Sequence, residues 1–180
     1  MNNMPHRRIH GAVALALGIA LLLSMALPVA AAVRARPLVG FGTGQDVLGP
    51  PIASCPAGSG WYVQENGKGF FTQLGSVKWT YHQCAAADLS TGYGWTTAPG
   101  SMTITAANGD QLLLSYEMRF RATPLPIPTT AQAQIKWTVA GGSGRFAGAR
   151  GFGGASIAIR YTPDLTGATS SSIWWGSIIH

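Results

Sequence analysis

The sequence has few charged residues, which limits the chemistry that it can carry. Charged side chains make up 10% of the 180 residues, and 6 acids stand against 12 Lys and Arg. The basic residues are spread along the chain without a run or stripe, so the electrostatic pattern of a nucleic-acid-binding protein is missing. We therefore expect a mildly basic, solvated surface and no nucleic-acid partner.

The sequence also lacks the local motifs of common nucleotide and hydrolase sites. It contains no G-x-x-x-x-G-K phosphate loop and no G-x-S-x-G nucleophile elbow. We expect no cofactor, and a hydrolase triad is disfavoured because no Ser is placed by sequence near a His and an acid.

The N-terminal residues have the pattern of an export signal. Arg7 and Arg8 precede an apolar run over 11–27, and small residues follow at 30–32. This layout is typical of a secretory signal peptide over residues 1–32, and an uncleaved membrane anchor is the alternative. We expect the rest of the chain to be secreted or extracytoplasmic, in the periplasm or at the cell surface, with no membrane span after processing.

Cysteine is nearly absent, and its even count has a simple interpretation behind an export signal. Cys55 and Cys84 are the 2 cysteines, and an oxidising compartment favours a disulfide between them. A metal site with His82 and His180 is the alternative, but it would have to gather its ligands from distant parts of the chain. We expect the disulfide and no metal.

Helical periodicity is missing beyond the signal, whereas strand alternation recurs to the C-terminus. The segments in which apolar and polar residues alternate are 76–84, 101–106, 112–121, 132–139 and 155–161. Period two is typical of strands with one buried face, and Asn108-Gly109 between two of these runs predicts a hairpin with a type I′ turn. The segment 171–180 is apolar on both faces, so we expect the core on one side of it and a subunit or loop on the other.

These strands define the predicted domain. Without helices to cover a sheet, they must pack against each other or close into a barrel, and the pattern alone does not separate the two. We place this all-β domain at 57–180. Residues 33–56 are rich in Gly and Pro and show no sustained period, so we expect an irregular N-terminal segment there.

A glycine-rich stretch at 138–156 needs its own explanation. Gly142, Gly144 and Ala147 fit the spacing of a dinucleotide-binding turn, but such a turn must open a helix, and here an alternating strand follows. The segment GGSGRFAGARG (141–151) instead resembles the G-G-T-G-x-F-x-x-A-x-G segment of the allene oxide cyclase and dirigent barrels and their small secreted bacterial relatives. TITAANGDQLLL (103–114) and TQLGSVKW (72–79) resemble a hairpin and a strand start of the same family.

The resemblance implies a single antiparallel up-and-down barrel of about eight strands with an apolar central cavity. It also implies a homo-oligomer, because the plant members are often trimers. The glycine stretch becomes a structural corner, with Phe146 and Ala149 packed against the barrel end. The residues expected to form this corner are Gly141, Gly142, Gly144, Phe146 and Gly151.

The candidate cavity residues follow from inward parity in the predicted strands. In a barrel whose interior is incompletely filled, inward aromatic side chains would line an apolar pocket. These candidates are Trp79, Tyr81, Tyr116, Phe120 and Trp137.

The six acids offer only weak catalytic candidates. Glu65 and Glu117 lie in strand-like segments and could form an acid/base pair, although Glu117 shares its parity with Arg119 and Arg121, which favours the solvent face. The acids interpreted as parts of turns are Asp46, Asp88, Asp110 and Asp164.

Three functions remain open from the sequence. The leading hypothesis is an exported barrel that binds a small apolar molecule in its cavity or acts through surface contacts, without catalysis. The alternative is an isomerase or cyclase that acts on an unsaturated epoxide or polyene, which requires Glu65 or Glu117 to point into the pocket. A carbohydrate or cell-surface polymer binder would need exposed aromatic residues grouped on one face, for which Trp61, Tyr93, Trp95, Trp174 and Trp175 are candidates.

Overall fold

The computed structural model describes residues 34–123 and 129–180, and this part of the chain is all-β. The predicted signal peptide lies outside the described residues. The strands are β1 (Arg36–Gly49), β2 (Trp61–Phe71), β3 (Gly75–Asp88), β4 (Tyr93–Thr96), β5 (Gly100–Ala106), β6 (Gln111–Ala122), β7 (Thr130–Ser143), β8 (Arg150–Tyr161) and β9 (Gly167–Ile179). A three-residue 3-10 turn, η1 (Gly144–Phe146), connects β7 to β8.

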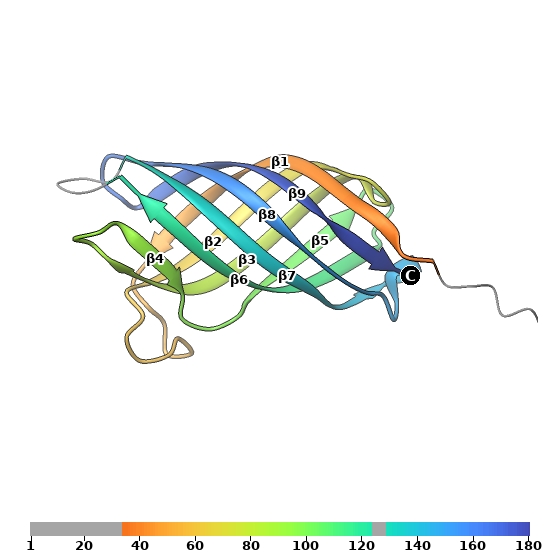
Figure 1. The fold of residues 1–180 in the computed structure, drawn as a ribbon, viewed down its shortest axis with the longest axis horizontal. Helices are drawn as coiled ribbons and strands as arrows, with labels where there is room; N and C mark the ends of the chain where they lie inside the picture. The colour runs from red at the N-terminus through yellow and green to blue at the C-terminus, as the bar shows by residue number, and fades with distance from the viewer. Residues whose placement is uncertain (1–33, 124–128) are drawn as a thin grey trace, which may run out of the picture. The chain divides into compact units, whose positions relative to one another are not determined.

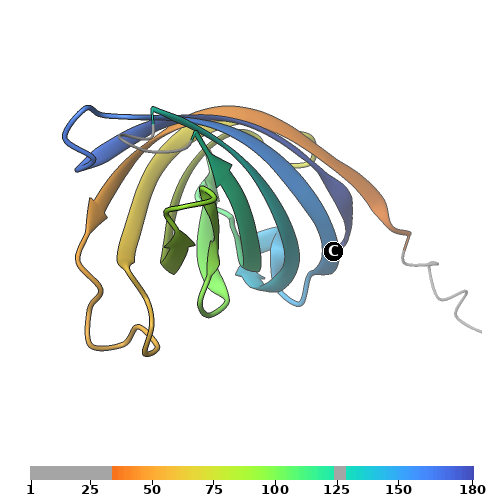
Figure 2. The same ribbon diagram turned by 60° about the vertical axis from the view of Figure 1, so that its left-hand side comes forward.

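The strands close into an antiparallel barrel (Figures 1 and 2). Every strand pairs with its neighbour in the sequence except β4 and β5, which do not pair with each other, and β9 returns to pair with β1 over 12 residue positions. Closure removes the free sheet edges that an open sheet would expose. The predicted eight-stranded up-and-down barrel is therefore confirmed, with β4 as one additional short strand.

The strand β4 shares its place in the barrel with β5. Both pair with β3 and β6. β4 pairs with residues 85–88 at the end of β3, and β5 pairs with residues 77–82 nearer its start. Residues 97–99 separate them, and Pro99 has no N–H to give to a ladder. One position in the wall is thus filled by a strand that is broken in two.

The alternation predicted for the five strand-like segments between 76 and 161 is confirmed, because their apolar positions face the barrel interior. Tyr81, Ile104, Tyr116, Ile135 and Ile157 are all buried there. The predicted hairpin at Asn108-Gly109 also forms, but its turn differs from type I′. Only Gly109 has a positive φ, of +88°, and its N–H bonds to the Ala106 carbonyl, as in a three-residue hairpin loop.

The prediction of an irregular segment at 33–56 is wrong over most of its length. Residues 36–49 form β1, so the barrel begins at Arg36 and the irregular part is the loop 50–60. The usual pattern is inverted in β1: Phe41 and Val47 face outward, while inward positions hold residues such as Gly44 and Asp46. Strand alternation is present there, but hydrophobicity does not reveal it.

The glycine-rich corner closes one end of the barrel. Gly144 has φ of +60°, which favours glycine, and Phe146 and Ala149 are buried against the core as predicted. Gly142 has no positive φ; a Cβ there would instead press on the carbonyl oxygens of Gln111 and Phe146. A strand, β8, follows the corner, so the helix that a dinucleotide turn requires does not follow.

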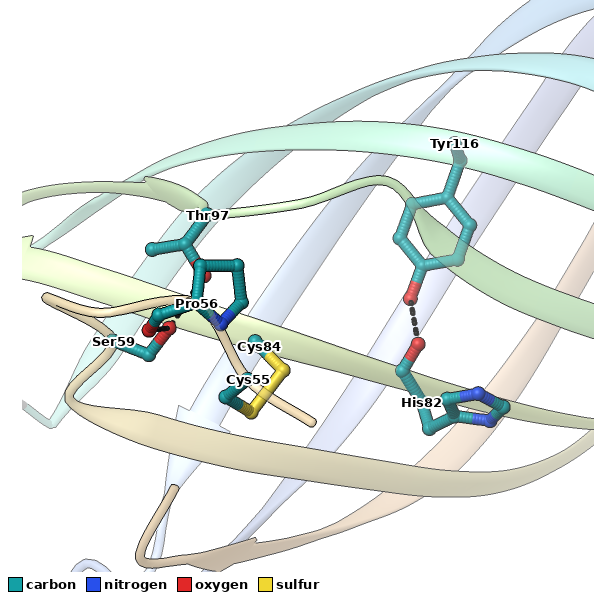
Figure 3. The surroundings of a disulfide bond; sticks show 7 residues. All are labelled: Cys55, Pro56, Ser59, His82, Cys84, Thr97 and Tyr116. Atoms are coloured by element: carbon teal, nitrogen blue, oxygen red, sulfur yellow. Dashed lines mark hydrogen bonds between the residues drawn. A yellow bond between two sulfur atoms is a disulfide. The ribbon is translucent and has the colours of Figure 1, made fainter. Parts of the chain in front are cut away.

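Cys55 and Cys84 form a disulfide, with their Cα atoms 5.5 Å apart (Figure 3). The bond ties the loop 50–60 to β3, and the Ser59 hydroxyl, 2.7 Å from that of Thr97, adds a second tether. Both thiols are consumed, which overturns the alternative of a metal site at these cysteines. Among the described residues, no three His, Cys, Asp or Glu side chains are grouped to hold a metal ion.

Candidate ligand-binding cavity

A cavity of about 180 Å³ lies inside the barrel at the end opposite η1. It is bounded by the last residues of β1, β3, β6 and β8 and the first residues of β2 and β9. Its wall is mainly apolar, with aromatic rings on several sides. The wall includes Trp61, Tyr81, Ala85, Phe120, Ala122 and Tyr161.

The floor of the cavity is polar. Asp46 and Gln83 both line it and are 7% and 5% exposed. The Tyr81 hydroxyl donates a hydrogen bond to Asp46 Oδ1 at 2.7 Å. The Gln83 amide nitrogen lies 3.6 Å from the Met118 sulfur, a weak acceptor, and Gln83 Oε1 accepts no hydrogen bond from the described residues. A buried acceptor without a donor is costly, so this oxygen marks a place where a ligand atom would be stabilised.

Glu65 lies directly behind Asp46. The two residues are opposite each other in the β1–β2 ladder, and their carboxyl groups are close enough to share a proton through a hydrogen bond. Glu65 also accepts hydrogen bonds from Trp79 Nε1 at 2.6 Å and from the Ser170 hydroxyl at 2.8 Å. These two donors hold the Glu65 carboxylate in place.

The surroundings of Asp46 favour its protonated form. Burial and the nearby Glu65 charge raise the pKa of Asp46 to about 8, and the Tyr81 hydrogen bond only partly opposes them. Burial also raises the pKa of Tyr81 and Tyr116 well above the ordinary phenol value and that of Tyr161 to about 12. At neutral pH, Asp46 is therefore a proton donor surrounded by neutral phenols.

The five predicted cavity aromatics all face the barrel interior, but only Tyr81 and Phe120 line the cavity. Trp79, Tyr116 and Trp137 are buried in the packed core. Trp79 and Trp137 fill space left by inward glycines of neighbouring strands, and the Trp137 indole N–H donates to the Gly154 carbonyl at 3.1 Å. The barrel is thus filled with side chains over most of its length and hollow at one end.

The two predicted acids are separated by the barrel wall. Glu65 is buried inside, whereas Glu117 is exposed on the outer face opposite Lys136. The candidacy of Glu117 as an acid in the pocket is therefore corrected. Asp46 was not identified as a site residue from the sequence, because its segment resembles a turn. Gln83 was not identified either, although a polar residue at an inward position of a regular strand could have indicated it.

The outer surface has a second hollow, of about 490 Å³, beside β4 and β6. Tyr93 and Trp95 line it, with ring centroids 5.9 Å apart, and Glu117 and Arg119 flank them. The carbohydrate hypothesis requires exposed aromatic residues on one face, and Tyr93 and Trp95 are the two of its five candidates that this hollow brings together. Trp61 instead lines the cavity inside the barrel.

An apolar patch covers the outside of β2, β1, β9 and β8. Phe41 is 62% exposed and lies between Phe70 and Ile173 in the ladders, while Val39 lies opposite Trp175. Trp174, the other tryptophan of β9, is buried inside the barrel. The outward face of the C-terminal strand is therefore uncovered in the single chain.

The fold and the cavity define a small up-and-down β-barrel with an apolar pocket above a buried carboxyl pair. No protein-family model matches the chain, and no curated protein or solved structure matches it either. No helix among the described residues is long and apolar enough to cross a membrane. The disulfide is compatible with an extracytoplasmic location.

Proposed function

We propose that the protein is an exported barrel that binds a small, mainly apolar molecule in the cavity above Asp46 and Gln83. The observation that carries the proposal is the unpartnered Gln83 Oε1 at the floor of a hollow with an apolar wall. An apolar cavity of roughly 150 Å³ holds one benzene-sized molecule, so this one suits a ligand with a single ring. Export through removal of residues 1–32 and the allene oxide cyclase/dirigent relationship are part of the same proposal.

Binding of a neutral probe tests the proposal. Toluene or 2-phenylethanol should raise the melting temperature of the purified protein in a saturable way, and native mass spectrometry should detect any retained molecule. Ala122→Phe at the cavity mouth should abolish the shift. Ala158→Phe makes the same change on the outer face of β8 and should leave it intact. Failure of every neutral probe to bind would contradict the proposed function.

The buried carboxyl pair favours one second candidate, an isomerase or cyclase. A protonated Asp46 beside an apolar cavity can donate its proton to an epoxide oxygen as the C–O bond breaks. The carbocation then closes onto the substrate's own double bond, and the product returns a proton to the Asp46 carboxylate. An enzyme would change the enantiomeric composition of a cyclised product relative to the uncatalysed reaction. Asp46→Asn should abolish that change, whereas Glu117→Gln on the outer face should not.

We further propose that the outer apolar patch contacts other copies of this chain, in the trimer that the family resemblance implies. A patch that joins Val39, Phe41, Phe70, Ile173 and Trp175 is typical of an interface between subunits. Light scattering on the purified protein measures the assembly. Phe41→Lys together with Ile173→Lys should yield monomers, and a wild type that is monomeric at all concentrations would contradict this proposal.

A further inference from the structure

The charges inside the barrel have one sign. Among the described residues, the buried charged side chains are Asp46 and Glu65, and every described Lys and Arg is at least partly exposed. Of the described residues that line the cavity, none is Lys, Arg or His. A ligand that brings an anionic group to the floor would therefore meet two carboxyl groups and no counter-ion.

Once Asp46 has released its proton, the polar atoms that a ligand would meet at the floor are acceptors. The Tyr81 hydroxyl already donates to Asp46, which leaves the remaining carboxyl oxygen of Asp46 and the amide oxygen of Gln83. Gln83 is 95% buried, lines the same cavity, and its Oε1 has no donor among the described residues. This unpartnered oxygen does not belong to the acid pair, but it also needs a hydrogen-bond donor. A single ligand group with more than one N–H could donate to both.

The wall above the floor suits a cation as well as an apolar ring. Trp61, Tyr81, Phe120 and Tyr161 line the cavity, and aromatic faces attract ammonium groups through the ring quadrupole, most strongly where water is excluded. A ligand that joins an ammonium head to a hydrocarbon ring would satisfy both the wall and the floor.

We propose that the cavity binds a small hydrophobic amine, with its ammonium group on the floor donating hydrogen bonds to Asp46 and to Gln83 Oε1. The inference rests on the proposed function and names its ligand class. It excludes a ligand that brings a carboxylate to this floor, because a carboxylate would be repelled from the carboxyl pair.

Binding moves one proton. The free protein holds a proton on Asp46 at neutral pH, and that proton leaves to solvent when an ammonium ion forms its ion pair with the carboxylate. The titratable groups that face Asp46 are Glu65 from β2, Tyr81 from β3, Tyr116 from β6 and Tyr161 from β8. The phenols keep their protons throughout, so affinity for the amine should rise between about pH 6 and 8, by at most about tenfold per pH unit.

Calorimetric titration of the full exported protein with three matched probes tests the inference. The probes are 2-phenylethylamine, 2-phenylethanol and phenylacetate, each at pH 6, 7, 8 and 9. At pH 8 we expect the amine to bind about 10- to 100-fold more tightly than the alcohol, the range expected for a charge-assisted hydrogen bond. We expect its affinity to rise with pH, that of the alcohol to stay constant, and phenylacetate to bind more weakly than the alcohol.

Variants locate the interaction. Asp46→Asn should remove the preference for the amine and its pH dependence while alcohol binding persists, and Gln83→Met should weaken amine binding about 3- to 10-fold. Glu117→Gln on the outer face should change nothing. Equal binding of amine and alcohol, or tighter binding of phenylacetate, overturns the inference and leaves the proposed function standing. If no probe binds at any pH, both the inference and the proposed function are contradicted. The pH profile is measured on the wild type, so this test does not depend on whether the variants fold.

Discussion

Trp79 donates its indole N–H to Glu65 at 2.6 Å, and both side chains fit inside the barrel because glycines face them. Gly42 and Gly67 leave room for the indole ring, and Gly44 leaves room for the Glu65 carboxyl group. The inward glycines of β1 and β2 thus make space for large side chains that project across the interior. The buried carboxyl pair depends on this space.

The first prediction concerns Gly44. A Cβ there would overlap the Glu65 carboxyl group, so Gly44→Ala should cost about 1 to 3 kcal/mol of stability and lower the melting temperature by several degrees. Gly49→Ala is the matched control at the end of the same strand, because a Cβ there would lie 3.9 Å from the Tyr62 carbonyl, an ordinary contact. Thermal unfolding of both variants measures the difference, and equal melting temperatures would contradict the proposed role of Gly44.

The same glycines explain why part of the fold could not be predicted from the sequence. The strands that carry Tyr81, Tyr116 and Trp137 have apolar residues inside and polar residues outside, so their alternation was visible. In β1 the order is reversed, because Gly44 faces inward against the Glu65 side chain of β2 and Phe41 faces outward. Such a strand is recognisable only once its partners are known.

The cavity was predictable in kind but not in place. Inward parity identified the interior aromatics, yet which of them pack and which line a hollow depends on the volumes opposite them. Trp137 is matched by Gly153 and Gly176 and packs tightly, whereas Phe120 lies near the barrel end, where the interior is not filled. The pairing of β1 with β2 places Asp46 opposite Glu65. This pairing is long-range, so no local sequence pattern encodes it.

The second prediction is a loss of stability as the pH rises. The pKa of Asp46 is raised to about 8 in the folded chain from about 3.9 in the unfolded chain. Between these values the folded state holds a proton that the unfolded state has lost, so the free energy of unfolding should fall as the pH rises from about 4 to 8. The slope from this group is at most about 1.4 kcal/mol per pH unit.

Urea unfolding at pH 5, 6, 7 and 8 measures this slope in the wild type and in Asp46→Asn. The variant cannot titrate at this position, so subtracting its curve removes the contributions of other groups. The lowered pKa values of Asp88 and Asp164 act in the opposite sense, at the acid end below about pH 4, outside the measured range. Parallel curves for the two proteins would show that the pKa of Asp46 is not raised.

The third prediction concerns the disulfide. Cys55 and Cys84 are 29 residues apart, and a cross-link of that span contributes about 3 to 4 kcal/mol by restricting the unfolded chain. Cys55→Ser together with Cys84→Ser should lower the free energy of unfolding by that order, while the barrel strands still form. Intact mass after alkylation, with and without reductant, should show two thiols only in the reduced wild type. Two free thiols in protein recovered from the exported fraction would contradict the pairing.

The last prediction separates two roles of the glycine-rich corner. Gly144 and Gly148 both have positive φ, of +60° and +75°, so alanine at either position is strained by the backbone alone. A Cβ at Gly148 would meet nothing within 4 Å, whereas one at Gly144 would overlap the carboxyl group of Asp110, which pairs with Arg145 at 3.2 Å. Gly148→Ala should therefore cost about 1 kcal/mol, and Gly144→Ala should cost more, because it also separates the corner from the β5–β6 hairpin. Thermal unfolding of the two variants gives the order, and a smaller effect at Gly144 would show that the contact with Asp110 does not hold the corner in place.

NAD and ATP should leave the melting temperature of the wild type unchanged, since the corner leads into a strand and offers no helix N-terminus to a phosphate. A saturable increase with either nucleotide would mean that the corner binds phosphate after all.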